Sequence, residues 1–523
     1  MLGPTGPEGM RFMRRLGVCV LVLAAAGSAA AWVETGECAG GPADPQVEVR
    51  GTWVTTTAND AISSAAKTKE SMRRLADMGM NTVYVEVWKN GYTQYPSEAL
   101  RKVVGVDRRP ALMKMDPSDS PEAVKTEGRD LLLETMVEAH RNGLAYIAWF
   151  EYGFMASHKS VPNDLWRKKP DWLSRDIKGN EIAPNGFVWM NPLHPGPRQF
   201  LLDLVLEAVD KYDLDGIQID DRIVWPYITM GYDDYTKKVY ASEHDGKEPP
   251  EDFKNAEWMR WRSEKVNEYS KRFVQEVRAR RPGLIVSLSP AVYPWCYENY
   301  CLEWPKWSAW GEKDRLPLGD FVLASRVTPR WDEFIPQCYR FSYDAFEKTW
   351  LDQVKWMNEL GGGRVGDMLP GIRVVGEGKD STWDDLRKSI ELTRSTGGGG
   401  HVLWYSKGAF LYEKELTAFY DAKGKGPAKH PKLAAGWRPR GVELVFKGKS
   451  EAGEQIWNTA SPEPGLTAGR WRIAVRKDGQ WTSRGVVDVD ATACDTGTGF
   501  HLSGEYDEMV WLRDRTSQNT APR

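Results

Sequence analysis

Short apolar stretches and longer amphipathic stretches alternate along the chain between about residues 48 and 406. In the longer stretches apolar residues recur at i, i+3, i+4 and i+7, and several end in Gly, a pattern that predicts helices. The clearest helices are expected at residues 65–79, 128–143, 198–212, 258–281 and 346–361. The apolar stretches between them are rich in β-branched and aromatic residues and predict eight strands: VEVRGTWVT (47–55), NTVYVEVW (81–88), LAYIAWFE (144–151), LDGIQIDD (214–221), LIVSLSP (284–290), FIPQCY (334–339), MLPGIRVV (368–375) and GHVLWYS (400–406).

Strands that alternate with helices pair in parallel through right-handed crossovers. Eight such units favour closure into a (β/α)₈ barrel. An open, doubly wound sheet is the structural alternative, but no GxGxxG motif opens a helix after the first strand. The sequence therefore predicts an α/β fold built on a TIM barrel.

The predicted barrel is longer than the ~250 residues typical of this fold. Its additional residues fall in four segments, each of which follows a strand and precedes a helix: 91–127, 152–194, 223–254 and 291–331. Such segments lie on the C-terminal face of a TIM barrel, where active sites are built. Functional side chains are therefore expected on that face.

After about residue 432 the pattern changes to short alternating segments separated by Gly-rich turns, including the hairpin signal KDGQ. It predicts a small all-β, sandwich-like domain behind the Lys-, Gly- and Pro-rich stretch KGKGPAKHPK. The resulting division of the chain is a signal peptide (1–31), an N-terminal linker (32–46), the barrel (47–421), a second linker (422–436), the β domain (437–515) and a tail (516–523).

The N-terminus has the order of a cleavable signal peptide. Arg11, Arg14 and Arg15 precede the apolar run GVCVLVLAAAGSAAA, which ends in small residues before Trp32. Basic, then apolar, then small residues are typical of export signals, so a secreted or periplasmic protein is expected. No later stretch is long and apolar enough to predict a membrane span.

Removal of that signal takes Cys19 with it and leaves five cysteines. Cys296 and Cys301, close together in CYENYC, are candidates for a disulfide in an oxidising compartment. An odd count leaves at least one free thiol, for which Cys338 in a predicted buried strand is the best candidate.

The composition is globular, with 41% hydrophobic and 27% charged residues. Lys and Arg total 70 against 73 Asp and Glu, so no basic surface indicates a nucleic-acid partner. Seven histidines without an HxH or HExxH pattern argue against a metal-dependent hydrolase, and no GxSxG elbow is present. Neither a metal nor a cofactor is expected. Most of the 24 tryptophans are expected in the core, and some in a cleft where flat rings stack on sugars.

The stretch LDGIQIDDR (214–222) carries the strongest catalytic signal. By period-two alternation, Gln218 and Asp220 point into the barrel lumen if the two isoleucines face the helices. Asp220 then ends its strand beside Asp221, and repulsion between adjacent carboxylates raises one pKa and separates an acid from a base. Cleavage of an acetal needs such a pair. The structural alternative is a salt bridge to Arg222 or a helix N-cap.

Glu151 is the second catalytic candidate, because it ends the strand that precedes LDGIQIDD and neighbours it in the barrel. Glu86 lies inside its strand and is either catalytic or part of a buried ion pair. Glu298 and Glu303, in the segment after the fifth strand, are further candidates. Polar and aromatic residues near strand ends are candidate substrate contacts: Trp88, Tyr92, Trp149, Trp189, Asn191, Gln218, Arg222, Trp225, Gln337, Tyr339 and Trp404.

The same stretches carry a resemblance to a known family. RGTWVTT, NTVYVEVWKNGYTQYPS, WFEYGFMA, VWMNPLHP and YDLDGIQIDDR resemble the glycosyl-hydrolase-like barrel family related to glycoside hydrolase family 10, over residues 50–405. The resemblance implies a TIM barrel, export, and hydrolysis of a bacterial cell-wall glycan or other bacterial polysaccharide. It also implies that Asp220 and Asp221 are the family's paired aspartates. Relatives commonly have His where this chain has Arg222.

These observations lead to the hypothesis of an exported glycoside hydrolase that uses Asp220, Asp221 and Glu151 on a polysaccharide or oligosaccharide. The alternative is a non-catalytic glycan-binding protein on the same scaffold. What separates the two is whether a second carboxylate lies within catalytic distance of Asp220.

Overall fold

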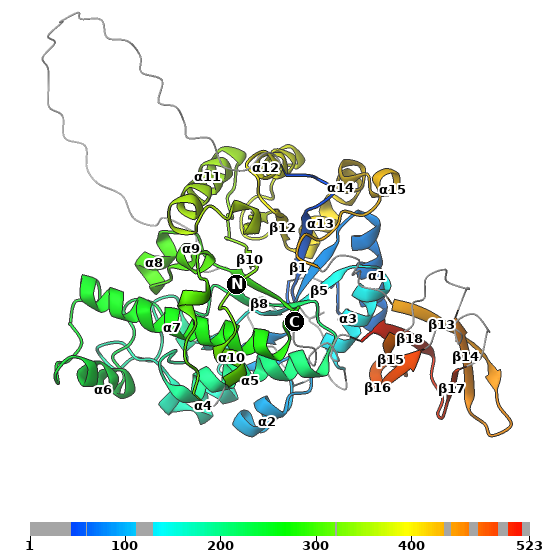
Figure 1. Ribbon diagram of the computed structural model, residues 1–523, viewed down its shortest axis with the longest axis horizontal. Coiled ribbons are helices and arrows are strands. Elements are labelled where there is room, and N and C mark those ends of the chain that lie inside the picture. The colour runs from blue at the N-terminus through cyan, green and yellow to red at the C-terminus, as the bar shows by residue number, and fades with distance from the viewer. Residues whose placement is uncertain are drawn as a thin grey trace, which may run out of the picture.

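The computed structural model describes residues 43–58, 60–110, 129–319, 322–433, 441–459, 469–489 and 500–514. Within these ranges, eight strands form one parallel sheet (Figure 1): β1 (Val49–Val54), β2 (Thr82–Glu86), β5 (Ala145–Phe150), β8 (Gly216–Asp220), β9 (Ile285–Ser289), β10 (Glu333–Phe334), β11 (Gly371–Arg373) and β12 (Gly400–Trp404). Each of them coincides with a strand predicted from the sequence.

The parallel sheet closes into a barrel. Its strands are hydrogen-bonded in the order β10-β9-β8-β5-β2-β1-β12-β11, which is chain order around a circle. The two end strands meet through parallel bridges between Phe334 and Met368 and between Gln337 and Gly371. The prediction of a TIM barrel is therefore confirmed.

Helices cover the outside of the barrel (Figure 1). Side chains that precede the first turn fix where they begin: Ser64, Asn255 and Ser342 each accept a backbone N–H bond at the start of α1, α7 and α11. The helices of this layer are α1 (Ala65–Asp77), α3 (Leu131–Arg141), α5 (Pro195–Lys211), α7 (Ala256–Arg280), α11 (Tyr343–Leu360), α12 (Trp383–Ser395), α13 (Ser406–Leu411) and α14 (Glu413–Tyr420).

The long segments after β2, β5, β8 and β9 carry short elements of their own. Because they follow the carboxyl ends of these strands, they build up the C-terminal face of the barrel, as the sequence predicts. Their elements are β3 (Trp88–Lys89), β4 (Tyr92–Thr93), α2 (Glu98–Val104), β6 (Met155–His158), α4 (Asp164–Lys168), η1 (Pro170–Trp172), β7 (Phe187–Trp189), α6 (Asp234–Glu243), α8 (Trp295–Tyr300), α9 (Trp304–Ser308), η2 (Glu312–Asp314) and α10 (Val322–Ser325).

The C-terminal part forms a six-stranded antiparallel sheet in the order β16-β15-β18-β13-β14-β17. Its β15–β16 hairpin turns at Asp478 and Gly479, both with positive φ, which matches the signal KDGQ. The predicted small all-β domain is therefore confirmed. Its strands are β13 (Gly441–Lys449), β14 (Gln455–Thr459), β15 (Gly469–Lys477), β16 (Gln480–Val489), β17 (Phe500–Leu502) and β18 (Glu508–Arg513).

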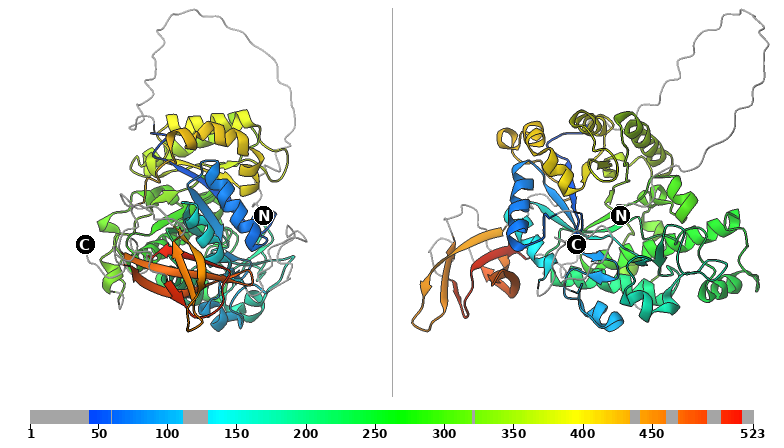
Figure 2. Two further views of the ribbon diagram at one scale, coloured as in Figure 1. Left: turned by 90° about the vertical axis from the view of Figure 1, so that its right-hand side faces the viewer. Right: turned by 180° about the vertical axis from the view of Figure 1, so that it is seen from behind.

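The β domain lies as a lobe at the side of the barrel (Figure 2). Charged side chains join the two parts. Arg141 at the end of α3 donates to Glu508 over 2.9 Å and to Glu443 over 2.8 Å. Arg472 of β15 donates to the buried Asp213 over 2.6 Å.

Residues 428–432, inside the predicted second linker, follow α15 (Ala422–Lys425) and lie across the N-terminal end of the barrel. The Lys429 N–H donates to the Gln46 carbonyl over 2.8 Å, and the Asn81 side-chain amide donates to the Ala428 carbonyl over 3.1 Å. The Lys432 ammonium bonds the Asp367 carboxylate, which belongs to η3 (Val365–Asp367). This stretch is thus attached to the barrel, while residues 434–440 lie outside the described residues.

Cys296, Cys301 and Cys338 are buried free thiols. The prediction of a free thiol at Cys338 is confirmed, whereas the candidate disulfide between Cys296 and Cys301 does not form. Cys296 lies in α8 and Cys301 is its C-cap, and residues five apart on a helix point to different sides. The predicted signal peptide, Cys19, Cys38 and Cys494 lie outside the described residues. No helix in the described ranges is long and apolar enough to cross a membrane.

Candidate active site

Carboxylates gather where three neighbouring strands end on the C-terminal face. Glu86 is the last residue of β2, Glu151 follows β5, and Asp220 ends β8 with Asp221 next to it. The strands β2, β5 and β8 are adjacent in the barrel, with Glu86 paired to Trp149 and Trp149 paired to Gln218. Sequence-distant acidic residues therefore meet at one side of the barrel mouth.

Arg222 is the centre of this cluster. Its Nη1 bonds the Asp220 carboxylate and lies 3.2 Å from Glu151 Oε1, and its Nε lies 3.6 Å from Asp221 Oδ1. The same Nη1 donates to the Glu151 carbonyl over 2.8 Å. Gly153 lets the chain pass close to Arg222, because a Cβ at that position would lie 2.5 Å from the Arg222 carbonyl oxygen.

One arginine does not compensate three carboxylates. Burial raises the pKa of Asp220 well above its ordinary value; Arg222 opposes the shift, while the charges of Asp221 and Glu151 add to it. The pKa of Asp221 is raised in the same way, first by burial and then by Glu151, against Arg222. This arrangement favours a proton held on the aspartate pair, which is the condition for a general acid.

The three predicted catalytic carboxylates differ in how freely a ligand can reach them. Both oxygens of Asp220 are engaged, Oδ2 by Arg222 and Oδ1 by the Gln337 amide over 2.9 Å. Glu151 is buried, yet its Oε2 has no hydrogen-bond partner in the described chain. The Asp221 side chain is 25% exposed and is the most accessible of the three.

Glu86 is part of a buried ion pair and also a neighbour of the cluster. Its carboxylate accepts from the Thr56 hydroxyl and from Lys89 Nζ over 3.3 Å. Burial raises its pKa, Lys89 lowers it, and Glu151 raises it further, so the two glutamates share one electrostatic environment. The role of Lys89 was not predicted, although its place three residues after Glu86 in VEVWKNG was a usable signal.

An aromatic group fills the lumen beneath and beside the carboxylates. Trp53 of β1 lies 6.2 Å from Trp149, 6.3 Å from Tyr339 and 5.8 Å from Trp404, measured between ring centroids. The Trp53 indole N–H donates to Gln218 Oε1 over 2.8 Å, which places Gln218 in the lumen as predicted by alternation. Trp53 itself was missed, because nothing local in RGTWVT indicates a partner on β8.

Three buried polar groups in this region have no hydrogen-bond partner in the described chain: the indole N–H of Trp149, Oε2 of Glu151 and the hydroxyl of Ser289. Trp149 is paired with Gln218, and Ser289 with Asp220, so these groups border the same cluster. Buried polar groups are normally bonded. Donors and acceptors left open beside aromatic rings are suited to the hydroxyl groups of a sugar.

Other predicted substrate contacts are buried and hydrogen-bonded within the fold. Trp88 and Trp225 are fully buried, and their indole N–H groups donate to the carbonyls of Gly153 and Met230. The Asn191 amide donates to Asp233 over 2.8 Å and to Thr236 over 2.8 Å, which anchors the start of α6.

Tyr92 and Trp189 are both almost fully buried, and the Trp189 ring lies 6.0 Å from that of Tyr300. Tyr300 approaches the cluster from α8: burial raises its pKa above the ordinary value, and the charge of Asp221 contributes to that rise. Glu303 is turned toward α7, where Ser263 donates to it over 2.9 Å, and Glu298 is exposed. Neither glutamate joins the Arg222 cluster.

In the described part of the chain, no three acidic, His or Cys side chains are grouped to hold a metal ion.

Comparisons with known proteins identify the family of the chain. The family model described as "Glycosyl hydrolase-like 10" matches residues 48–318. The chain is similar to the glycosyl hydrolase YngK of Bacillus subtilis, at 27% identity over 46% of this chain and 45% of that protein. It is also similar to the glycosyl hydrolase DigH of Escherichia coli, at 23% identity over 55% of this chain and 62% of that protein. The chain thus spans only about half the length of these curated relatives.

Among solved structures, the glycoside hydrolase domain of PgaB (BpsB) from Bordetella bronchiseptica matches with a TM-score of 0.49 and 14% identity, covering 72% of this chain and 98% of that one. Alpha-L-fucosidase isoenzyme 2 from Paenibacillus thiaminolyticus matches with a TM-score of 0.42 and 15% identity, covering 72% of this chain and 50% of that one.

Proposed function

Because the chain belongs to the glycosyl hydrolase-like 10 family, we propose that it is an exported glycoside hydrolase that cleaves a polysaccharide of the bacterial cell wall or another bacterial glycan. The observation that carries the proposal is the cluster of Glu151, Asp220 and Asp221 around Arg222 at the mouth of the barrel. Acetal cleavage needs one protonated and one ionised carboxyl group, and this cluster favours mixed protonation.

The three carboxylates have different roles in this proposal. Asp221 is the proton donor, because it is the most exposed of them and its pKa is raised. Glu151 is the anionic partner, since Oε2 is unbonded while Oε1 is held by Arg222. Asp220 is bonded through both oxygens and adds negative charge that stabilises the developing oxocarbenium ion.

The aromatic group supplies the platform for the sugar. Trp149, Tyr339 and Trp404 border the cluster, and apolar sugar faces stack on such rings. The open indole N–H of Trp149 and the hydroxyl of Ser289 bind sugar hydroxyls.

Export through the N-terminal signal, with the mature chain beginning near Trp32, places the enzyme outside the cytoplasm.

The test is product analysis on purified bacterial cell-wall glycan with the wild type and Asp221→Asn. Asparagine keeps the shape of the side chain but cannot donate a carboxyl proton, so turnover should fall by ~10²–10⁴. The matched control is Asp203→Asn on the exposed side of α5, which should keep wild-type turnover.

Each outcome separates the proposed enzyme from its alternative. New reducing ends made by the wild type and the control, but not by Asp221→Asn, support the assignment. Binding of glycan by the wild type without any product assigns the chain to the non-catalytic glycan-binding class instead. Full turnover by Asp221→Asn removes Asp221 as the acid.

A further inference from the structure

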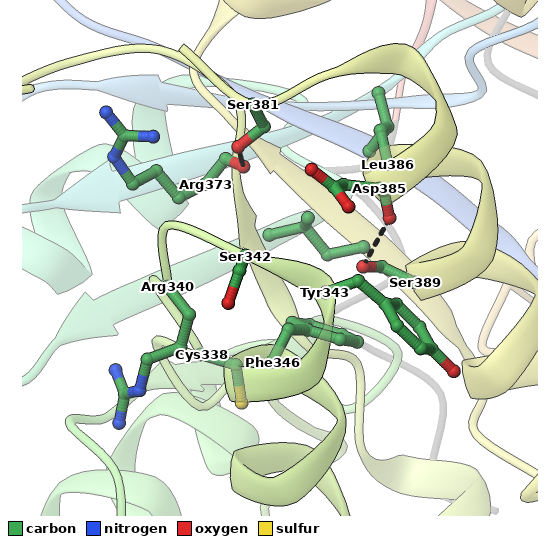
Figure 3. A pocket seen from close by; sticks show the side chains of 11 residues that line it. Cys338, Arg340, Ser342, Tyr343, Phe346, Arg373, Ser381, Asp385, Leu386 and Ser389 are labelled. Atoms are coloured by element: carbon green, nitrogen blue, oxygen red, sulfur yellow. Dashed lines mark hydrogen bonds between the residues drawn. The ribbon is translucent and has the colours of Figure 1, made fainter. Parts of the chain in front are cut away.

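Cavities of very different size lie beside the barrel. The cavity shown in Figure 3 lies between α11 and α12 and has a volume of only about 10 Å³, which leaves room for one water molecule at most. Another pocket has a volume of about 470 Å³, within the range of small-molecule sites. Its walls come from η1 and the start of α5, in the segment after β5, and from the start of α6, in the segment after β8.

Hydrogen bonds hold the walls of this larger pocket in place. The Arg175 carbonyl accepts the N–H groups of Gly231 and Tyr232 over 2.9 and 2.8 Å, which ties the two segments together. Asp233, the N-cap of α6, accepts from the Asn191 amide over 2.8 Å. The pocket is therefore formed before a ligand enters, which lowers the cost of binding.

Two rings, those of His194 and Tyr235, line the pocket with their centroids 4.6 Å apart. His194 belongs to the stretch VWMNPLHP, to which the proposed function gives no role. Its Nδ1 accepts the Gly196 N–H over 3.0 Å, so Nε2 carries the proton of the neutral ring. Burial lowers the pKa of this imidazole, against the charges of Asp171 and Asp233. At neutral pH His194 therefore offers a hydrogen-bond donor without a charge.

Charges of both signs line the same pocket without being paired. Asp234 and Lys238 lie four residues apart on α6, and neither has an ion pair or hydrogen bond in the described chain. The same Asp-to-Lys spacing forms ion pairs over 3.2 Å on α4 and over 2.6 Å on α12. Asp171 of η1 is unpaired as well, whereas Arg175 is paired with Glu181 over 2.6 Å. The pocket thus keeps two carboxylates and one ammonium for a ligand.

A ligand with only one kind of charge fits this lining less well. An anion would be repelled by Asp171 and Asp234, and a simple amine would leave Lys238 without a partner. A neutral sugar carries no charge that either kind of group could pair with. A ligand that carries both an ammonium and a carboxylate complements all three groups.

We propose that this pocket binds a small zwitterion, either a free amino acid or a short peptide with both ends free. Its ammonium pairs with Asp171 and Asp234, and its carboxylate accepts from Lys238 and from His194 Nε2. Its apolar side chain packs on the Tyr235 ring.

The proposal is independent of the glycosidase function. None of Glu151, Asp220, Asp221 and Arg222 lines the pocket. A ligand in it contacts the segments after β5 and β8, but it does not occupy the candidate active site.

The test measures binding of small compounds to the purified chain by calorimetry: leucine, alanyl-leucine, N-acetyl-alanyl-leucine and alanyl-leucine amide. The dipeptide with both ends free should bind at least about tenfold more tightly than either capped form, because each cap removes a hydrogen bond between charged groups. Leucine that binds as tightly as the free dipeptide supports an amino acid as the ligand. Tighter binding of the dipeptide supports a peptide.

Variants should remove the two preferences separately. Lys238→Met should abolish the preference for the free carboxylate over the amide and keep the preference for the free amine. The double variant Asp171→Asn, Asp234→Asn should do the reverse. Lys237→Met, on the same helix but outside the pocket lining, is the matched control and should keep both preferences. The side chains changed in the pocket are exposed, so melting curves should stay those of the wild type.

The proposal is overturned if neither free form binds, if either capped form binds as tightly as the free dipeptide, or if both preferences survive in the variants. Cellobiose is the neutral probe. Binding of cellobiose that is lost in the double variant Asp171→Asn, Asp234→Asn assigns the pocket to a sugar and also overturns the proposal. Glycan turnover does not enter these measurements, so their failure leaves the glycosidase function in place.

Discussion

The two ends of the barrel hold buried charge in opposite ways. At the N-terminal end, the fully buried Glu48 lies between two cations, 2.8 Å from Arg50 and 2.7 Å from Arg394. At the C-terminal end, Arg222 lies among three carboxylates. Two arginines around one carboxylate keep that carboxylate ionised. One arginine with three carboxylates leaves negative charge in excess.

The pKa values follow this difference. Burial raises the pKa of Glu48, but hydrogen bonds from Arg394 and Arg50 outweigh burial and hold it below the ordinary value. Burial raises the pKa of Asp220 well above the ordinary value, and Arg222 does not cancel the effect. A group kept ionised in the fold contributes to stability, whereas a cluster with excess negative charge retains a proton, which in the proposed function Asp221 donates. In TIM barrels the first belongs to the N-terminal face and the second to the C-terminal face.

The N-terminal end is further closed by the chain itself. His430 Nε2 lies 3.3 Å from Glu333, whose other oxygen accepts from the Tyr84 hydroxyl over 3.0 Å. Lys432 reaches Asp367 beside β11. These contacts connect residues 428–432 to β10, β2 and η3 at the N-terminal end of the barrel, so the stretch serves stability rather than spacing.

The largest expected effect comes from Glu48→Gln. Removing this charge leaves Arg50 and Arg394 without their buried partner, which costs ~3–5 kcal/mol of unfolding free energy. Turnover per folded molecule should not change, because the site lies at the opposite end. Urea unfolding and a glycan turnover assay measure the two quantities. Glu391→Gln, an exposed ion pair of α12, is the control and should lose less than ~1 kcal/mol. A stable Glu48→Gln would contradict the comparison.

Asp220→Asn should show the opposite behaviour. Loss of one charge from the electrostatic stabilisation of a transition state costs ~10²–10³ in rate. Stability should stay the same or rise, because a repelling carboxylate is removed while Arg222 keeps Glu151 and Asp221. A melting curve measures the stability of the variant, and initial rates measure its turnover. A variant that unfolds early but turns over normally per folded molecule would make Asp220 a structural residue.

The fold was readable from the sequence because its signals are local. Each strand and helix of the barrel is marked by the spacing of its own apolar residues, and the KDGQ turn by its own Gly. The candidate site was readable in part for the same reason: alternation within LDGIQIDD places Gln218 and Asp220 in the lumen, and Glu151 ends the adjacent strand.

The rest depends on contacts between distant residues. Trp53 meets Gln218 across 165 positions, and no local pattern indicates that pair. The sequence pattern predicts Trp88 and Trp225 as cleft residues near strand ends, and it does not indicate that both side chains are fully buried. The Lys- and Pro-rich stretch before the β domain has linker composition, yet its backbone and Lys432 find partners on the barrel floor. The composition of a segment does not show which residues it will contact in the fold.

A change in pH should affect the stability contributions of Glu48 and Asp220 in opposite directions. Glu48 has a lowered pKa, so its stabilisation is complete above its unfolded pKa and is lost as pH falls through the folded one. Asp220 has a raised pKa, so its ionisation costs stability as pH rises from its unfolded pKa through the folded one. The deficit of Glu48→Gln should therefore grow only as pH rises from the lowered folded pKa of Glu48 to about 4.5 and stay constant above it, while Asp220→Asn should gain on the wild type as pH rises above about 3.8. Each slope is at most about 1.4 kcal/mol per pH unit. Urea unfolding between about pH 2.5 and 8 covers both windows, below about 4.5 for Glu48 and above about 3.8 for Asp220, and parallel curves would contradict the assignment.

The smallest expected effect is that of Lys432→Gln at the edge of the N-terminal network. The Lys432 side chain is 22% exposed, so solvent screens its bond to Asp367 and the loss should be only ~0.2–1 kcal/mol. The variant nevertheless tests whether residues 428–432 belong to the barrel. In the wild type, trypsin should cut slowly after Lys429 and Lys432, because the backbone there is bonded to Gln46 and the side chain to Asp367. In Lys432→Gln, cleavage after Lys429 should become faster while turnover stays unchanged. Rapid cleavage at Lys429 in the wild type would restore the linker interpretation and remove this stretch from the stabilising end.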